Sequence, residues 1–243
     1  MAVKAGKKVT RDWFGNWSNE YDRTLGSLEF HRALLDMVVK NSGVRRGCKV
    51  LDIGCGTGLL TLKFLKATDC SITAVDNSNK MLAIFEDKIK KLKLRNQVVC
   101  KLMDADSIKF PADTFDIAAS TLAIHHLKEK LNPIRKIYRV IKPGGVFLIG
   151  EIDMDTTGKL TDIDRFKRII RVLEQEWLAG LEAGDLSIFE RMFDNSKRHI
   201  FNQGDYCVSL KQWAELCKKA GFRKVAVKKV PRHKCFGIVI AKK

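Results

Sequence analysis

Acidic residues and glycines gather where two short apolar segments of the chain end. The first segment, Val50–Ile53, contains Asp52, and three glycines follow it at alternate positions: Gly54, Gly56 and Gly58. A buried strand that enters a tight glycine turn and opens a helix brings its backbone against a nucleoside-containing ligand. Asp76 ends the second segment, where its carboxylate can accept hydrogen bonds from both hydroxyls of a ribose. These residues predict a cofactor site.

The spacing of the glycines indicates which kind of cofactor is bound. A dinucleotide site uses the pattern GxGxxG, in which the third glycine comes one position later than it does here. Asp52 would also place negative charge near a pyrophosphate. A cofactor that carries an amino acid and a positive sulfonium suits these acids better. Asp104 and Ala105, past the third predicted strand, offer a further carboxylate suited to an adenine amino group.

Two adjacent histidines, His125 and His126, follow the fourth predicted strand. A histidine there could act as a general base at neutral pH, and His125 is our candidate. The alternative, which we favour at this point, is that one histidine caps the following helix and the other packs. Glu151 and Asp153 end the fifth strand and either face the same crevice or bind a helix terminus. The other histidines show no spacing suited to a metal, so we expect no metal site.

The elements around these residues alternate between strand and helix, which is typical of a doubly wound parallel sheet. The expected strands are Lys49–Ile53, Ser71–Val75, Val98–Leu102, Phe115–Ser120 and Gly145–Gly150. The expected helices are Leu59–Lys66, Asn79–Lys91 and Leu131–Ile141, the last ended by Pro143-Gly144-Gly145. We therefore expect one α/β domain with a cofactor-binding core at 48–152.

Three further segments flank this core. Residues 1–47 form an N-terminal helical cap, in which Trp13, Trp17 and Tyr21 recur four apart as one aromatic stripe that favours core packing. Residues 153–205 form a helical insertion, a candidate lid beside the crevice or a plain structural helix pair. Residues 206–243 form a helix and an antiparallel hairpin. The insertion has an apolar stripe: Phe166, Ile169, Ile170, Leu173 and Trp177.

The composition of the 243 residues limits the protein class. No stretch approaches the roughly 18 apolar residues of a membrane span, and the basic, polar start does not resemble a signal peptide, so we expect a cytoplasmic protein. The seven cysteines show no CxxC pair, which favours reduced, mostly buried thiols. The formal net charge of +17 would attract nucleic acid or another polyanion, or it simply solvates the surface. The oligomeric state is left open.

Five motifs in order resemble those of the class I S-adenosylmethionine-dependent methyltransferases, in particular the quinone-biosynthesis or type 11 group. They are Asp52–Gly58, Val75–Leu82, Met103–Ala105, Phe115-Asp116 with His125–Leu127, and Arg139–Gly145. The resemblance covers about residues 48 to 152. It implies a Rossmann-like sheet of seven strands in the order 3-2-1-4-5-7-6, with the last strand antiparallel. One departure is Met103, which stands where the family commonly has glycine.

The resemblance also implies a role for individual residues toward S-adenosyl-L-methionine. Gly54, Cys55 and Gly56 would line its methionine portion, and Asp52 would orient the glycine loop and the cofactor's amino group. Asp76 would hold the ribose. The remaining positions would surround the adenine or the sulfonium: Asn77 and Met81 flanking the adenine, Asp104 and Ala105 at its edge, Ser120 and Thr121 below the sulfonium, and Tyr21 closing over the cofactor.

Three hypotheses about function follow. The first is an enzyme that transfers a methyl group to a small-molecule acceptor by in-line displacement. The second keeps the cofactor but makes transfer RNA or ribosomal RNA the acceptor, because of the positive charge. The third is a non-catalytic cofactor-binding protein, against which the intact set of Asp52, the glycines and Asp76 argues. The acceptor itself is not identified by any motif.

Overall fold

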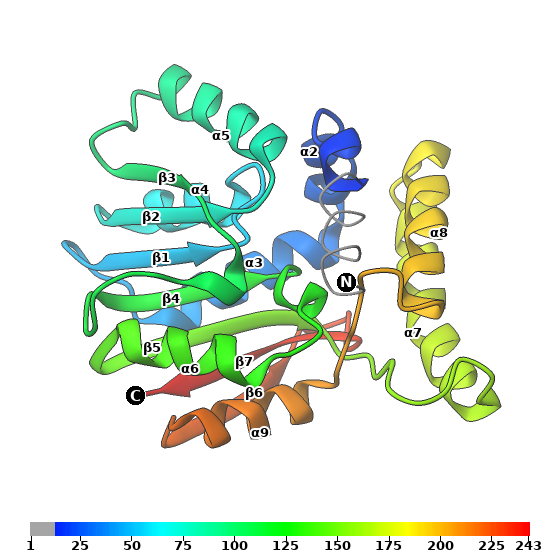
Figure 1. Cartoon of the computed structure of the whole chain (residues 1–243). Coiled ribbons are helices and arrows are strands. Elements are labelled where there is room, and N and C mark those ends of the chain that lie inside the picture. The colour runs from blue at the N-terminus through cyan, green and yellow to red at the C-terminus, as the bar shows by residue number, and fades with distance from the viewer. Residues whose placement is uncertain (1–12) are drawn as a thin grey trace.

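A seven-stranded sheet forms the centre of the molecule, with strands in the order β3-β2-β1-β4-β5-β7-β6 (Figure 1). The computed structural model describes residues 13–243. The strands are β1 (Lys49–Ile53), β2 (Ser71–Asp76), β3 (Val98–Leu102), β4 (Phe115–Thr121), β5 (Ile141–Ile152), β6 (Lys224–Lys229) and β7 (Phe236–Lys242). The first five pair in parallel, and β7 is antiparallel to both β5 and β6. This confirms the expected strand order and the antiparallel last strand.

Helices cover both faces of the sheet, which is why the central strands are apolar on both sides. One face carries α3 (Glu29–Ser42), α4 (Leu59–Ala67) and α5 (Asn79–Lys91), and the other carries α6 (Leu131–Val140) and α9 (Leu210–Ala220). Short turns of helix lie between these elements: α2 (Tyr21–Thr24), η1 (Leu25–Ser27), η2 (Ala105–Ser107) and η3 (Ile124–His126). None of the helices within residues 13–243 is long and apolar enough to cross a membrane.

The connection between α6 and β5 differs from the expectation. The expected helix end at Pro143-Gly144-Gly145 is instead part of β5, which already starts at Ile141. Pairing with β4 jumps from Phe115 opposite Ile141 to Ile117 opposite Val146, so the extra residues form an irregularity in the strand. Gly144 has φ +76°, a conformation that suits glycine at such a bulge.

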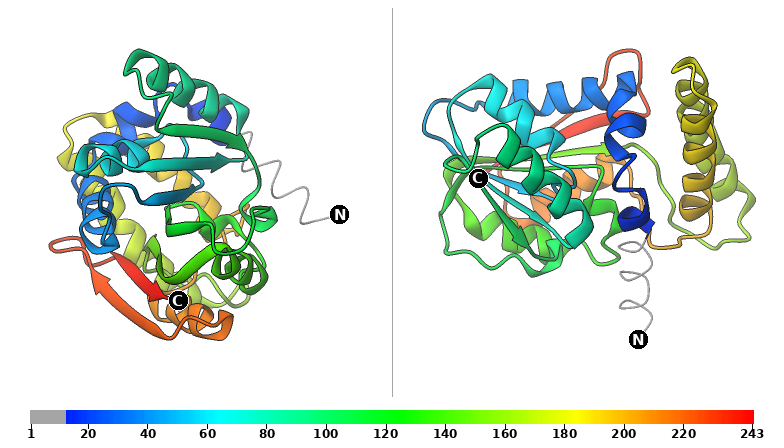
Figure 2. Two further views of the ribbon diagram at one scale, coloured as in Figure 1. Left: turned by 90° about the vertical axis from the view of Figure 1, so that its left-hand side faces the viewer. Right: turned by 90° about the horizontal axis from the view of Figure 1, so that it is seen from above.

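The helical insertion contains two long helices, α7 (Ile163–Glu182) and α8 (Leu186–Ile200), which pack against each other beyond the carboxyl ends of the parallel strands (Figures 1 and 2). Asp162 and Asp185 cap their N-termini through side-chain hydrogen bonds to backbone N–H groups. The ion pair of Arg23 with Asp185, at 2.9 Å, ties α8 to the N-terminal segment. The insertion therefore lies beside the crevice at which α/β sheets bind ligands.

The buried stripe of α7 agrees with the predicted one at Ile169 and Leu173 and differs from it at Phe166. Its buried positions are Arg165, Ile169, Leu173, Glu176 and Gly180, whereas Phe166 is 47% exposed. The Arg165 guanidinium is buried because it donates to the carbonyls of Thr156 and Ile200, at 2.9 and 2.8 Å. A hydrophobic pattern does not register a polar residue that is buried with its partners.

Candidate active site

The glycine loop after β1 is fixed by close packing. Gly54 has φ +68°, and a Cβ atom built on it would lie 2.3 Å from the Cβ of Ala123, so a larger residue does not fit. The amides of Gly54 and Cys55 both donate to the carbonyl of Val75, at 2.8 and 3.0 Å. Gly56 differs, because a Cβ atom there would meet nothing within 4 Å. The loop thus presents bare backbone at Gly56.

The Asp76 carboxylate, at the end of β2, holds this loop in place. It accepts hydrogen bonds from the amides of Gly56 and Ser78, both at 2.8 Å. Burial raises the pKa of Asp76, although these backbone donors oppose the rise. Each carboxylate oxygen can accept a further hydrogen bond, so the group can orient the loop and still bind two hydroxyls.

A cavity opens in front of the loop and encloses about 840 Å³, its open mouth included. The predicted cofactor residues that line it are Tyr21, Gly54, Gly56, Asp76, Asn77, Met81, Asp104, Ala105 and Thr121. Residues not predicted as cofactor ligands complete the wall: Phe14, Ser78, Met103, Leu122, Ala123, His126 and Leu127. We call this space the first cavity.

Three predicted cofactor residues do not line the first cavity: Asp52, Cys55 and Ser120. Asp52 is buried inside the core and accepts a hydrogen bond from Thr61 Oγ1 at 2.6 Å, and burial raises its pKa to about 7. Ser120 donates to the carbonyl of Ile53 at 2.8 Å. Cys55 is buried beside α5. These side chains face the helices and strands behind the loop, because the turn directs only Gly54 and Gly56 to the cavity.

A second, mostly apolar cavity adjoins the first beneath α7 and α8. Its wall is formed by Phe14, Trp17, Tyr21, Leu25, Phe30, Leu122, His125, His126, Ile152, Glu176, Met192, Asn195 and His199. Four of these residues also line the first cavity: Phe14, Tyr21, Leu122 and His126. Trp17 is 2% exposed and packs edge-on against Tyr21 with ring centroids 5.1 Å apart, although Tyr21 begins a separate helix and is only partly buried. The two cavities meet at this shared wall.

His125 stands in the wall of the second cavity as one half of a buried pair. Its Nδ1 atom lies 2.7 Å from Glu151 Oε2, and the backbone amides of Ala123 and His125 donate to the other Glu151 oxygen. Burial would lower the pKa of His125, but the charge and hydrogen bond of Glu151 outweigh burial and raise it. The expectation that one histidine caps the next helix, α6, is wrong. At the start of α6 the backbone amide of Leu131 donates to the Glu129 carboxylate, at 2.9 Å, and not to a histidine.

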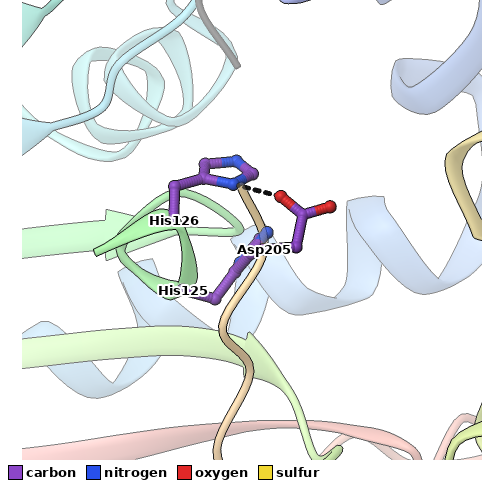
Figure 3. Close-up of side chains that lie close together, drawn as sticks. All are labelled: His125, His126 and Asp205. Carbon is purple, nitrogen blue, oxygen red and sulfur yellow. Dashed lines mark hydrogen bonds and ion pairs between the residues drawn. The ribbon is translucent and has the colours of Figure 1, made fainter. Parts of the chain in front are cut away.

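His126 belongs to a second buried network, centred on Asp205 (Figure 3). Asp205 lies 2.6 Å from His126 Nδ1 and accepts from Arg198 Nε at 3.1 Å. Although burial opposes it, the neighbouring histidines hold the pKa of Asp205 far below its usual range. Burial lowers the pKa of His126, and the positive charge of the neighbouring His125 lowers it further. His199, whose Nδ1 is 3.6 Å from Asp205, completes the network, and burial lowers its pKa to about 4.

The cluster of His125, His126 and Asp205 offers the atom types that bind metals, within 4.8 Å of one another. The Arg198 guanidinium, however, already supplies the positive charge that Asp205 requires, and Glu151 engages His125. We therefore interpret the cluster as a hydrogen-bond network. Sequence reasoning missed Arg198, Asp205 and Glu176, because these residues come from the insertion, where no motif marks them. Asp153, the other acid predicted at the end of β5, accepts a hydrogen bond from the amide of Leu210 and so binds the N-terminus of α9.

The first cavity suits a sulfonium cofactor better than a nucleotide phosphate. Asp76 and Asp104 line it, and within the described part of the chain neither Lys nor Arg does. Phosphates are bound by cations and helix N-termini, whereas a sulfonium and an amino group are stabilised by carboxylates and aromatic faces. The bare Gly56 backbone also leaves room for a ligand that packs against the loop. The residues present therefore fit S-adenosylmethionine.

Comparison with known proteins gives the same answer. Residues 51–149 match the family model described as "Methyltransferase domain". The chain is 31% identical over 170 residues to the ubiquinone/menaquinone biosynthesis C-methyltransferase UbiE of Idiomarina loihiensis, covering 68% of each chain. It is 31% identical over 159 residues to the demethylmenaquinone methyltransferase of Staphylococcus aureus, covering 63% of this chain and 64% of the relative.

A solved structure shares the fold. Phosphoethanolamine N-methyltransferase 2 of Haemonchus contortus, in complex with phosphomonomethylethanolamine and S-adenosylhomocysteine, superposes with a TM-score of 0.69 at 19% identity. The match covers 94% of this chain and 57% of the nematode chain. At this identity the likeness concerns the fold alone.

Proposed function

Since the chain belongs to the class I S-adenosylmethionine-dependent methyltransferases of the type 11 group, we propose that the first cavity holds the cofactor and the second holds the methyl acceptor. The observation that carries this assignment is the shared wall between the two cavities, with His125 and His126 beside it. In-line methyl transfer needs donor and acceptor to meet at one point with water excluded. The shared wall supports the first of these needs, because it brings the two cavities together at one point.

The cofactor is proposed to contact the residues that line the first cavity. Asp76 would bind the ribose hydroxyls, and Gly54 and Gly56 would pack against the methionine portion. The adenine would be surrounded by Asn77, Met81, Asp104 and Ala105, with Thr121 and Tyr21 nearer the sulfonium. Three further residues would hold the glycine loop from the side away from the first cavity: Asp52, Cys55 and Ser120. When bound, the cofactor supplies a methyl group made electrophilic by the positive sulfur.

We assign His125 as the general base for an acceptor that must lose a proton. Glu151 fixes the Nδ1 side of the ring, which leaves Nε2 as the atom that takes the proton. The Glu151 carboxylate would then stabilise the imidazolium. His126 would keep the junction closed through its bond to Asp205.

A small-molecule acceptor in the cytoplasm is the function we favour. The Idiomarina and Staphylococcus relatives are, by name, methyltransferases of quinone biosynthesis, which supports a small molecule rather than RNA. The apolar second cavity beneath α7 and α8 is lined by aromatic and aliphatic side chains, which also suits a small organic molecule.

Cofactor binding is the first test of this proposal. S-adenosylhomocysteine at saturation should raise the melting temperature of the wild-type protein, because a ligand of the native state stabilises it. Asp76→Ala should abolish the rise, whereas Asp87→Ala, which changes an exposed residue on α5, should not. If the wild-type melting temperature stays constant at millimolar ligand, the first cavity is not the cofactor site.

A further inference from the structure

Glu176 is a carboxyl group in a place where the fold gives it no partner. It occupies the buried stripe of α7 between Leu173 and Gly180, is 7% exposed, and lines the second cavity. Within residues 13–243 it makes no hydrogen bond or ion pair. Burial raises the pKa of Glu176 to about 7; His125 acts against the rise and Asp205 adds to it. An unpaired buried carboxyl destabilises a fold, so a ligand is the natural partner.

A second polar atom in the same wall is also unsatisfied. Asn195, on α8, lines the second cavity, and its buried Oδ1 atom has no hydrogen-bond partner. Its Nδ2 atom lies 3.4 Å from His199 Nε2. Glu176 and Asn195 thus bring two hydrogen-bond acceptors from the two helices of the insertion to one cavity. A ligand that satisfies both must carry hydrogen-bond donors.

The charges around the cavity indicate the sign of that ligand. Asp205 is paired with Arg198 at 3.1 Å, and Glu151 with His125 at 2.7 Å. Glu176 is left without a cation of its own among the described residues. The neighbouring walls are aromatic, contributed by Phe14, Trp17, Tyr21 and Phe30. A carboxyl group within an aromatic cavity suits an ammonium group, because the positive charge of the ligand favours the ionised form of the carboxyl.

We propose that Glu176, with Asn195, selects the methyl acceptor, and that this acceptor is a compact molecule with a basic amino group. The amino group is the anchor, and the apolar body lies against the aromatic wall. The proposal rests on the assignment of the second cavity to the acceptor. It names the chemistry of the acceptor, which the family and the fold leave open.

The test measures binding to the full chain saturated with S-adenosylhomocysteine. Calorimetry would compare 2-phenylethylamine and tyramine with 2-phenylethanol and 4-(2-hydroxyethyl)phenol, which replace the amine by a hydroxyl. We expect the amines to bind about tenfold or more tightly than their hydroxyl analogues, as a charged hydrogen bond implies. Glu176→Gln should remove most of this preference. Glu174→Gln, an exposed residue on the same helix, should leave it unchanged.

Several results would overturn the proposal. One is equal binding of amine and alcohol, another is an unchanged preference in Glu176→Gln, and a third is tight binding of hydroquinone that does not depend on Glu176. Glu176→Met, which keeps the length of the side chain without charge, gives the same comparison if the amide variant does not fold. If the wild-type protein does not bind S-adenosylhomocysteine, the proposed function is refuted instead. A failure of this proposal and a failure of the proposed function are therefore distinguishable.

Discussion

His125 owes its orientation to a carboxylate that comes from a different strand. Glu151 lies in β5, and its two oxygens engage the imidazole and two backbone amides of the η3 turn. Because Glu151 is fully buried, its negative charge is screened little by water and acts mainly on the histidine. The pair therefore has the arrangement of a base and the residue that orients it.

Replacing His125 tests its role as the base. His125→Ala should lower kcat by about 10² to 10⁴-fold on an acceptor that loses a proton, which is the usual contribution of a general base. The rise in melting temperature with S-adenosylhomocysteine should persist, because His125 lines only the second cavity. As a control, His233→Ala removes a histidine that lines neither cavity. Unchanged turnover in His125→Ala would show that another group, or none, removes the proton.

The raised pKa of Glu176 predicts how the stability of the protein depends on pH. Its pKa is raised from 4.5 to about 7 by burial, so between these pH values the folded chain binds a proton that the unfolded chain has released. As pH rises from about 4.5 through 7, the folded chain loses this proton, and the free energy of unfolding falls by about 3 kcal/mol in total. Glu176→Gln does not titrate. The variant should therefore gain stability relative to wild type between pH 5 and pH 8.

Urea denaturation at both pH values measures that difference. The comparison of two pH values cancels the fixed cost of burying the amide, so only the titration of residue 176 remains. Glu174→Gln should show no such change, because Glu174 is exposed. A constant difference between Glu176→Gln and wild type would mean that Glu176 is charged and paired in solution.

The residues that line the first cavity were easier to predict than those that line the second. The glycines and Asp76 lie at the ends of β1 and β2, two neighbouring strands whose apolar pattern marks those ends in the sequence. Glu176, Asn195 and Asp205 come instead from separate places in the insertion, and only the packing of α7 on α8 brings them together. Local sequence patterns do not contain that packing.

The glycine loop between β1 and α4 packs closely against the turn after β4. Gly54→Ala would place a Cβ 2.3 Å from the Cβ of Ala123 and hold a residue with φ +68°. The variant should be destabilised by several degrees in melting temperature or fail to fold. Gly56→Ala has φ +52° and free space, so it should lose only about 1 kcal/mol in stability.

The two glycine variants separate folding from binding. In Gly56→Ala the added methyl group would occupy the wall of the first cavity, so we expect weaker binding of S-adenosylhomocysteine by a folded protein. Thermal denaturation with and without the ligand measures both effects in one experiment. Full ligand affinity in Gly56→Ala would place the cofactor elsewhere, and wild-type stability in Gly54→Ala would contradict the close approach to Ala123.

The helices and strands of the core were predicted to within one or two residues at most ends, because buried strands and amphipathic helices have distinct periods. The exception is β5, where Pro143-Gly144-Gly145 is a strong local signal for the end of a helix. There the pairing with β4 absorbs the extra residues in a bulge. On α7 the prediction placed the exposed Phe166 in the stripe and left out Arg165 and Glu176, because these two are buried polar residues.

The excess of positive charge, +17 for the chain, is partly used within the fold. Basic residues of the C-terminal segment make contacts to other elements: Lys228 to Asn41, Lys229 to Asp153 and Lys243 to Asp113. These contacts connect the C-terminal segment to α3 and to the loops after β5 and before β4. Part of the positive charge of the C-terminal segment is thus paired within the fold.

Binding to nucleic acid should consequently be electrostatic and without sequence preference. We expect labelled poly(U) and a transfer RNA mixture to bind at 20 mM salt and to be released by about 200 mM, because each phosphate contact releases a counterion and the affinity falls steeply with salt. Filter binding across a salt series measures this. A folded transfer RNA that stays bound at 200 mM, or that takes up a labelled methyl group from S-adenosylmethionine, would show that RNA is the acceptor. Release of both polymers at the same salt concentration, with label entering only the small-molecule fraction of a cell extract, is the result that the second cavity predicts.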